Sequence, residues 1–210
     1  MYLAPEIDKV LDDNKHKFIG ELSYNAIVRR LGLAFDFPKD LKFKVEEFKD
    51  VDVNEFTVSG LYDMINNKKY IILNVSDEGK SLEFDEKTFS SFKFLISQTI
   101  QHESIHQNQW QHRDDVDEPI KLDFRNFGGT IEEEREYLAD IDEIDAYAHD
   151  IVMEMKYYYP KEDPYKVLRR INRARKLPSY LYYKYTFKNC SWYKIKKHLF
   201  SKIYKWIPYV

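Results

Sequence analysis

One five-residue stretch constrains this chain more than any other: His102, Glu103 and His106 spell H-E-x-x-H within the segment 92–113. That segment holds neither glycine nor proline, and its apolar residues recur with the period of an α-helix. Histidines four residues apart lie on one face of a helix, so their imidazoles can bind one metal ion. Glu103 lies about 100° round the helix from His102, where its carboxylate can reach a metal-bound water without binding the metal.

Zinc (Zn2+) is the metal that this spacing favours. A catalytic zinc takes three protein ligands and keeps one position for water, whose pKa it lowers to about 7. Those parts are enough to hydrolyse an amide bond without a covalent intermediate. The pattern therefore predicts a hydrolytic zinc site whose third protein ligand comes from another segment of the chain.

Residues 131–158 can supply that ligand, because most of this segment has a helical period. Glu143 and Ala146 share one face of the predicted helix, and the small Ala146 would allow close approach to the H-E-x-x-H helix. Glu136 and His149 are competing candidates for the third ligand. Glu143 is the preferred one.

The two segments together resemble the gluzincin metallopeptidases, in which H-E-x-x-H is followed by a helix bearing E-x-x-A. Carried over residue by residue, the resemblance implies zinc ligands at His102, His106 and Glu143, with Glu103 as the general base. FLISQTIQHESIHQNQ followed by YLADIDEIDAYA is also similar to small uncharacterised H-E-x-x-H proteins of large tailed phages. The resemblance covers about residues 56–155.

This chain departs from the gluzincin pattern at one position. Many of these families have Asp four residues after the ligand Glu, where this chain has Tyr147. The orientation of a ligand histidine must then depend on another group, such as Asp140, Asp145 or a backbone carbonyl. A hydrolase of this type also needs a donor that stabilises the oxyanion, and Tyr137, Tyr147 and a tyrosine of the tail are the candidates.

Upstream of the H-E-x-x-H helix the sequence changes its period. Residues 41–48 alternate between apolar and polar, residues 54–65 are rich in β-branched and aromatic types, and 70–75 form an apolar run. Asn66 and Asn67 favour a hairpin. These features predict two to four antiparallel strands, one of which could pair at its edge with an extended peptide substrate.

The fold class expected is α+β. The resemblance implies a zincin-like domain, in which a small antiparallel sheet packs on the H-E-x-x-H helix and on a second helix that bears a ligand. A helical C-terminal appendage follows. Residues 5–31 are expected to be helical, and residues 76–86 and 114–130 are expected to be loops.

Charge is distributed unevenly along the chain. Residues 161–210 carry 14 Lys and Arg against Glu162 and Asp163, a net charge of +12, whereas the first 160 residues carry −15. This split predicts a metallopeptidase domain at 1–160 and a basic, aromatic helical appendage at 161–210.

The appendage has an apolar stripe at helical spacing, made of Trp192, Ile195, Leu199, Ile203 and Trp206. An aromatic stripe of this kind is usually part of a core, so docking of the tail on the acidic part of the chain is the favoured expectation. A membrane surface and nucleic acid are the other partners that the basic residues could serve.

Composition limits the setting of the protein. No apolar run approaches the roughly 18 residues of a membrane span, and the N-terminal residues lack the apolar core of a signal peptide. Cys190 is the single cysteine, which rules out an internal disulfide. A cytoplasmic protein is expected, located in the host cytoplasm or the virion if a phage encodes it.

These observations predict a zinc-dependent peptidase that acts on peptide or protein substrates through a water activated by Glu103, with Tyr147 assisting. The alternative is a structural or assembly protein, such as a phage virion component in contact with other virion proteins, that retains the zinc site. A purely structural zinc has no use for a general base, so Glu103 favours the enzyme.

Overall fold

The computed structural model describes residues 4–112, 130–188 and 192–210. Among these residues, all strands lie in the first half of the chain. The chain divides into two compact units, Met1–His112 and Arg113–Val210, which we call the sheet unit and the helical unit. The boundary therefore differs from the expected one at residue 160, because residues 131–158 share a hydrophobic core with the tail. The α+β class is as predicted.

A three-stranded sheet has the order β2-β4-β3 and comprises β2 (Leu41–Phe48), β3 (Phe56–Asp63) and β4 (Lys68–Ser76). The predicted hairpin is present: β3 and β4 pair antiparallel, and the left-handed Asn67 (φ 49°) ends the turn between them. The expectation of a purely antiparallel sheet is wrong, because β2 and β4 pair in parallel. Successive strands alternate in direction, so β2 and β4 run the same way. They are parallel neighbours because β4 lies between β2 and β3 in the sheet.

A second, two-stranded sheet pairs β1 (Gly20–Ser23) with β5 (Ser81–Phe84) in antiparallel register. The segment 76–86 therefore contains a strand, and the expected helical segment 5–31 contains another between its helices. Four residues are too few to give a readable alternation, which is why the sequence did not indicate these strands. The remaining elements here are α1 (Ala4–Asp13), η1 (Lys15–Lys17) and α2 (Tyr24–Ala34).

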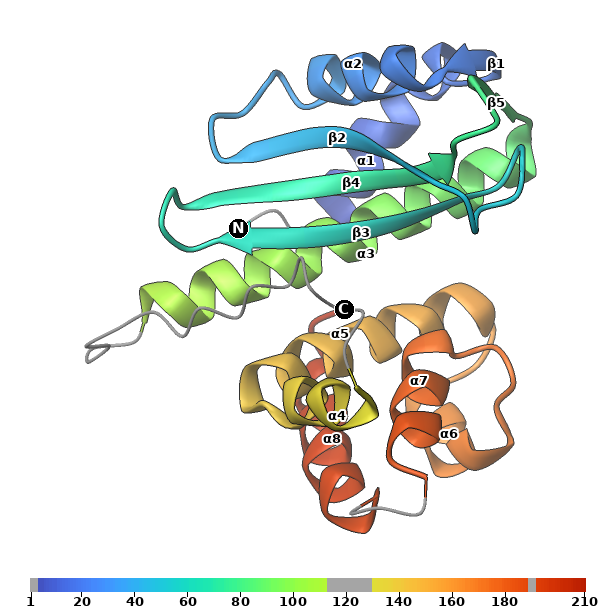
Figure 1. Ribbon diagram of the computed structural model, residues 1–210. Helices are drawn as coiled ribbons and strands as arrows, with labels where there is room; N and C mark the ends of the chain where they lie inside the picture. The colour runs from blue at the N-terminus through green and yellow to red at the C-terminus, as the bar shows by residue number, and fades with distance from the viewer. Residues whose placement is uncertain (1–3, 113–129, 189–191) are drawn as a thin grey trace. The chain divides into compact units, whose positions relative to one another are not determined.

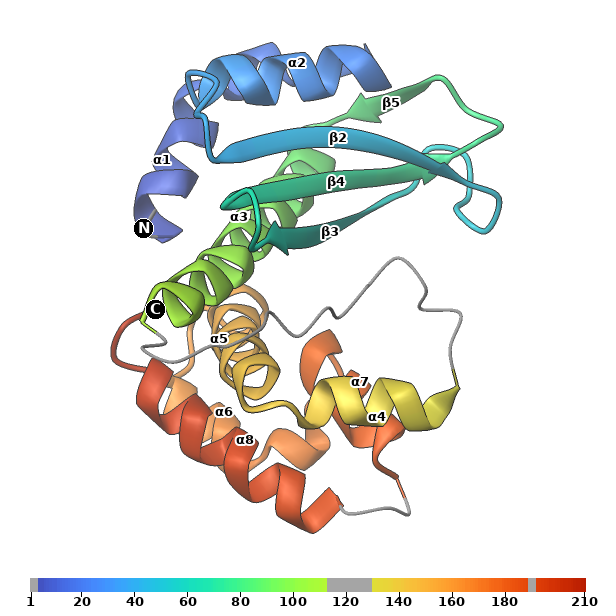
Figure 2. The ribbon, with the colours of Figure 1, turned by 60° about the vertical axis from the view of Figure 1, so that its left-hand side comes forward.

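Helix α3 (Glu86–Gln111) carries the H-E-x-x-H motif and lies against β3 and β4 (Figures 1 and 2). It begins where Asp85 accepts a hydrogen bond from the Thr88 amide at 2.6 Å, and no glycine or proline interrupts it. Its core-facing stripe is buried among the apolar side chains of both sheets and of α1 and α2; the stripe consists of Phe89, Phe92, Ile96 and Ile100. The core of the sheet unit thereby fixes the helix that bears both histidines.

The helical unit consists of α4 (Ile131–Ala139), α5 (Ile141–Tyr158), α6 (Pro164–Arg169), η3 (Ile171–Arg173), α7 (Pro178–Thr186) and α8 (Trp192–Trp206). Helix α8 packs along α5 with its buried Ile195, Leu199 and Ile203. Its Lys202 forms an ion pair with Asp145 at 3.1 Å. Within the described residues, no helix is both long and apolar enough to span a membrane. The expected loop 114–130 lies, except for Thr130, outside the described residues.

Candidate metal centre

The two histidines of the motif present the same ring nitrogen to one point. On α3 the Nε2 atoms of His102 and His106 lie 3.1 Å apart, and the rings cross at 71°. Two nitrogen ligands, each about 2.0–2.1 Å from a tetrahedral zinc ion, lie roughly 3.3 Å apart. The spacing of the pair therefore fits a shared metal ion, as i and i+4 positions on a helix predict.

Gln109 orients one of these rings. Its Oε1 lies 3.0 Å from His106 Nδ1, so in the matching tautomer Nδ1–H donates to the amide oxygen and Nε2 keeps its lone pair for a metal. The sequence offered Asp140 and Asp145 for this kind of role. Asp140 instead caps α5 through the Asp142 amide, and Asp145 accepts from Trp206 Nε1 at 3.0 Å and pairs with a lysine of α8.

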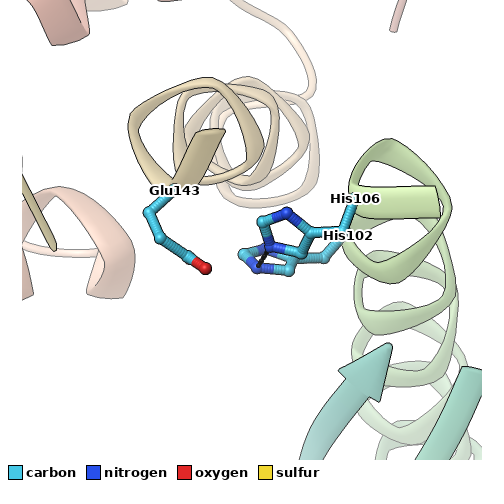
Figure 3. A group of neighbouring side chains, drawn as sticks. All are labelled: His102, His106 and Glu143. Carbon is cyan, nitrogen blue, oxygen red and sulfur yellow. Dashed lines mark hydrogen bonds between the residues drawn. The ribbon is translucent and has the colours of Figure 1, made fainter. Parts of the chain in front are cut away.

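The third residue, Glu143, lies in the first turn of α5 and is buried. Among the described residues, His102, His106 and Glu143 form a group whose metal-ligating atoms all lie within 4.8 Å of one another (Figure 3). Two imidazole nitrogens and one carboxylate are a donor set that zinc accepts. This group could hold a metal ion.

The competing ligands do not belong to that group. Glu136 on α4 is exposed, and His149 on α5 turns its ring edge-on to Trp206 with the ring centroids 5.1 Å apart. The Nδ1 of His149 lies 3.7 Å from Asp150 Oδ1. His149 is therefore part of the packing between α5 and α8.

Glu103 continues the core-facing stripe of α3 by one more turn, after Ile96 and Ile100, and is buried. Opposite it on β3 is Gly60: a Cβ at this position would lie 2.7 Å from Glu103 Cγ and 2.7 Å from Thr99 Cγ2. The missing side chain at Gly60 is what lets the carboxylate fit between helix and strand.

Tyr147 lies one turn after Glu143 on α5. Burial, and then the negative charges of Glu143 and Asp150 with Tyr182, raise the pKa of the Tyr147 hydroxyl well above its usual value. A hydrogen bond from Tyr137 acts in the opposite direction and is outweighed. The shift extends to higher pH the range over which Tyr147 keeps its proton and can act as a hydrogen-bond donor. The two tyrosines predicted for the oxyanion are thus partners of each other.

A buried lysine that the sequence did not reveal holds the last part of α3. Lys69, at 1% exposure, lies within β4 and donates to Asp40 at 3.0 Å and to Gln107 at 2.5 Å. Gln107 also donates to Asn67 at 2.9 Å. In the sequence Lys69 falls between the two segments expected to be strands, 54–65 and 70–75, and so looks like a turn residue. These hydrogen bonds connect Gln107, the residue after His106, to the hairpin of β3 and β4.

Comparison of the sequence with protein-family models, with curated proteins and with solved structures gives no match. The resemblance to gluzincins and to phage proteins therefore rests on the H-E-x-x-H and E-x-x-A patterns alone. What the geometry itself supports is the group of His102, His106 and Glu143, which could bind a metal ion.

Proposed function

We propose that the protein is a zinc-dependent peptidase of the gluzincin type with a zincin-like arrangement of sheet and helices. The observation that carries the proposal is the group of His102, His106 and Glu143, whose ligating atoms lie within 4.8 Å of one another, with Glu103 beside the first histidine. Zinc held there supplies a Lewis acid for the substrate carbonyl and lowers the pKa of a water ligand to about 7.

Glu103 and Tyr147 have different roles in this proposal: Glu103 transfers the proton, and Tyr147 donates a hydrogen bond. Glu103 takes a proton from the attacking water and passes it to the leaving amine, as a carboxylate general base does. Tyr147, like any tyrosine whose pKa is not lowered, is protonated at neutral pH, so its O–H is available to donate to the oxyanion. Burial of Glu103 between α3 and β3 favours transfer to substrate over exchange with bulk water.

Strand β3 supports a proposal for the substrate class. Among the described residues, β3 pairs only with β4 in the sheet β2-β4-β3, and its Gly60 lies against Glu103. A peptide that adds to the open edge in extended form acquires main-chain hydrogen bonds and passes next to the general base. Extended peptides or unfolded segments of proteins are therefore the substrates proposed.

The experiment that tests the proposal compares Glu103→Gln with the native protein on a mixed peptide library. The amide keeps the size of the side chain but removes the base, so hydrolysis should fall by about 100-fold or more while bound zinc, measured by elemental analysis, stays unchanged. A native protein that binds zinc and cleaves no peptide would contradict the enzyme and favour the structural or assembly role instead.

A further inference from the structure

Helix α8 has two faces of opposite character. Its buried residues, Ile195, Leu199 and Ile203, recur every four residues and pack into the core of the helical unit. The opposite face is exposed and basic. Lys194, Lys197 and Lys205 fall within roughly a quarter of the helix circumference, centred away from the buried stripe.

Two contacts join α8 to α6 and η3. The ring of Tyr204 on α8 lies 6.0 Å from that of Tyr165 on α6, and Lys196 donates to Asn172 of η3 at 3.4 Å. The neighbouring elements add exposed cations of their own. We call the exposed cations of these three elements together the basic face; they are Lys166, Arg169, Arg173, Lys194, Lys197 and Lys205.

Few carboxylates neutralise the basic face. In residues 161–210 the acidic residues are Glu162 and Asp163; Glu162 pairs with Arg170, and Asp163 caps α6. Within the described part of the chain, none of the six cations forms a salt bridge with a carboxylate. A surface with so many uncompensated positive charges attracts a polyanion.

The uncharged side chains exposed near these cations indicate which polyanion fits the basic face, an anionic membrane or a nucleic acid. A helix that binds an anionic membrane must insert its apolar face, but the apolar face of α8 is already buried within the protein. The large hydrophobic side chains exposed on α6 and α8 are tyrosines instead: Tyr165, Tyr193 and Tyr204, with 37%, 83% and 50% exposure. Aromatic rings next to Lys and Arg suit unpaired bases and phosphates.

We propose that the basic face binds single-stranded nucleic acid, the cations contacting phosphates and the exposed tyrosines stacking on bases. This inference is independent of the proposed peptidase activity, since no residue of the basic face belongs to the metal-ligating group. Binding should be largely independent of sequence, because stacking and phosphate contacts carry little base information.

The test measures fluorescence anisotropy of a labelled mixed-sequence DNA strand of about 20 nucleotides with the full chain at several salt concentrations. The variant Lys194→Glu, Lys197→Glu, Lys205→Glu should bind at least about tenfold more weakly. Its plot of log affinity against log salt should be shallower by about 2, since each lost phosphate contact removes about 0.7.

A matched control carries the same change of charge on the sheet unit: Lys39→Glu, Lys49→Glu, Lys87→Glu, all at exposed positions. It should bind the strand within about twofold of the native protein, so an equal loss in both triple variants would overturn the proposal. The double variant Tyr193→Ala, Tyr204→Ala should weaken binding to the single strand and spare binding to duplex DNA. Absence of binding at about 50 mM salt, or stronger binding to phosphatidylglycerol vesicles than to the strand, would also contradict it.

Discussion

Gly60 of β3 lies directly against the carboxylate side chain of Glu103 on α3, so closely that a Cβ on the glycine would lie 2.7 Å from Glu103 Cγ. Real Cβ atoms do not approach a neighbour this closely, and the atoms concerned are not the free end of a surface side chain. The fit between helix and strand at this point therefore depends on one missing methyl group.

Gly60→Ala should displace Glu103 while leaving the histidines of α3 in position. Because a shift of about 1 Å can cost on the order of 100-fold in rate, peptide hydrolysis should fall by about tenfold or more with zinc content unchanged. Ser59→Ala, at an exposed neighbour in the same strand, is the control and should retain activity. Full activity of Gly60→Ala would show that the carboxylate of Glu103 is not the base.

Gln109→Ala should weaken metal binding, because Gln109 Oε1 lies 3.0 Å from His106 Nδ1 and fixes the ring tautomer. Loss of such a partner typically costs about 10–100-fold in metal affinity. Gln109→Glu keeps an acceptor oxygen and should restore the affinity, and Asn108→Ala should have no effect. Zinc affinity is measured by competition with a chelating dye; equal affinities for all three variants would contradict this role.

Glu143→Ala should lower zinc affinity more than either competing substitution, since a site with three protein ligands has no spare donor. Glu136→Ala and His149→Ala are the matched comparisons, because both residues were candidates for the same role. Equilibrium dialysis with zinc gives the stoichiometry and the dissociation constant of each. Full occupancy in Glu143→Ala together with loss in one of the other two would refute the ligand set.

Substitution of Asp40 should lower the stability of the fold more than substitution of Lys69. The reason is that the side chain of Lys69 is 2% exposed, whereas that of Asp40 is 43% exposed. Asp40→Ala leaves a buried ammonium without its counter-charge and should cost about 3 kcal/mol of stability. Lys69→Met removes the buried charge, and the remaining carboxylate can be hydrated, so about 1 kcal/mol is expected. Urea unfolding of both variants gives the order; the reverse order would contradict the argument.

Acid should remove the difference in stability between the native protein and the Asp40→Ala variant. Burial alone would raise the pKa of Asp40, but the hydrogen bond and charge of Lys69 outweigh it and hold the pKa below its usual value. The ion pair therefore stabilises the fold above the unfolded pKa of about 3.9, and this stability is lost as the pH falls through the folded pKa. Urea midpoints that stay apart in strong acid would be inconsistent with this linkage.

Alkaline pH should destabilise the helical unit through Tyr180. Burial raises the pKa of this tyrosine to about 12, and its hydroxyl donates to Asn172 at 2.6 Å. Since the folded pKa exceeds the unfolded value of about 10, its contribution to stability is complete below pH 10 and falls as the pH rises from about 10 toward 12. Tyr180→Phe should flatten the decline of the urea midpoint in this range, whereas Tyr193→Phe, at an exposed site, should not.

The sequence predicted most of what has a periodic or spacing signature. The sequence indicates three strands, their hairpin and the long helix of His102 and His106, and it favours Glu143, which the structure groups with the two histidines. Each of these features repeats at a helical or strand period, or follows a fixed offset along one helix, so local residues suffice to indicate it.

Features that depend on long-range contacts could not be read in this way. Gly60 looks like an ordinary strand residue until Glu103 is placed against it, and Lys69 looks like a turn residue until Asp40 and Gln107 surround it. The parallel pairing of β2 with β4 likewise depends on which edge β3 has taken. A signal for Gln109 did exist, three residues after His106 on the same helix, since i and i+3 side chains meet.

The central position of β4 has a consequence for the order of events during synthesis of the chain. Both β2 and β3 precede β4 along the chain, yet in this sheet each of them pairs with β4 alone. As the polypeptide leaves the ribosome at about 5–20 residues per second, neither outer strand can find its partner until β4 has emerged. In the chain, β4 is followed by β5 and then by helix α3. Translation therefore delivers His102 and His106 only once every strand against which their helix packs is already available.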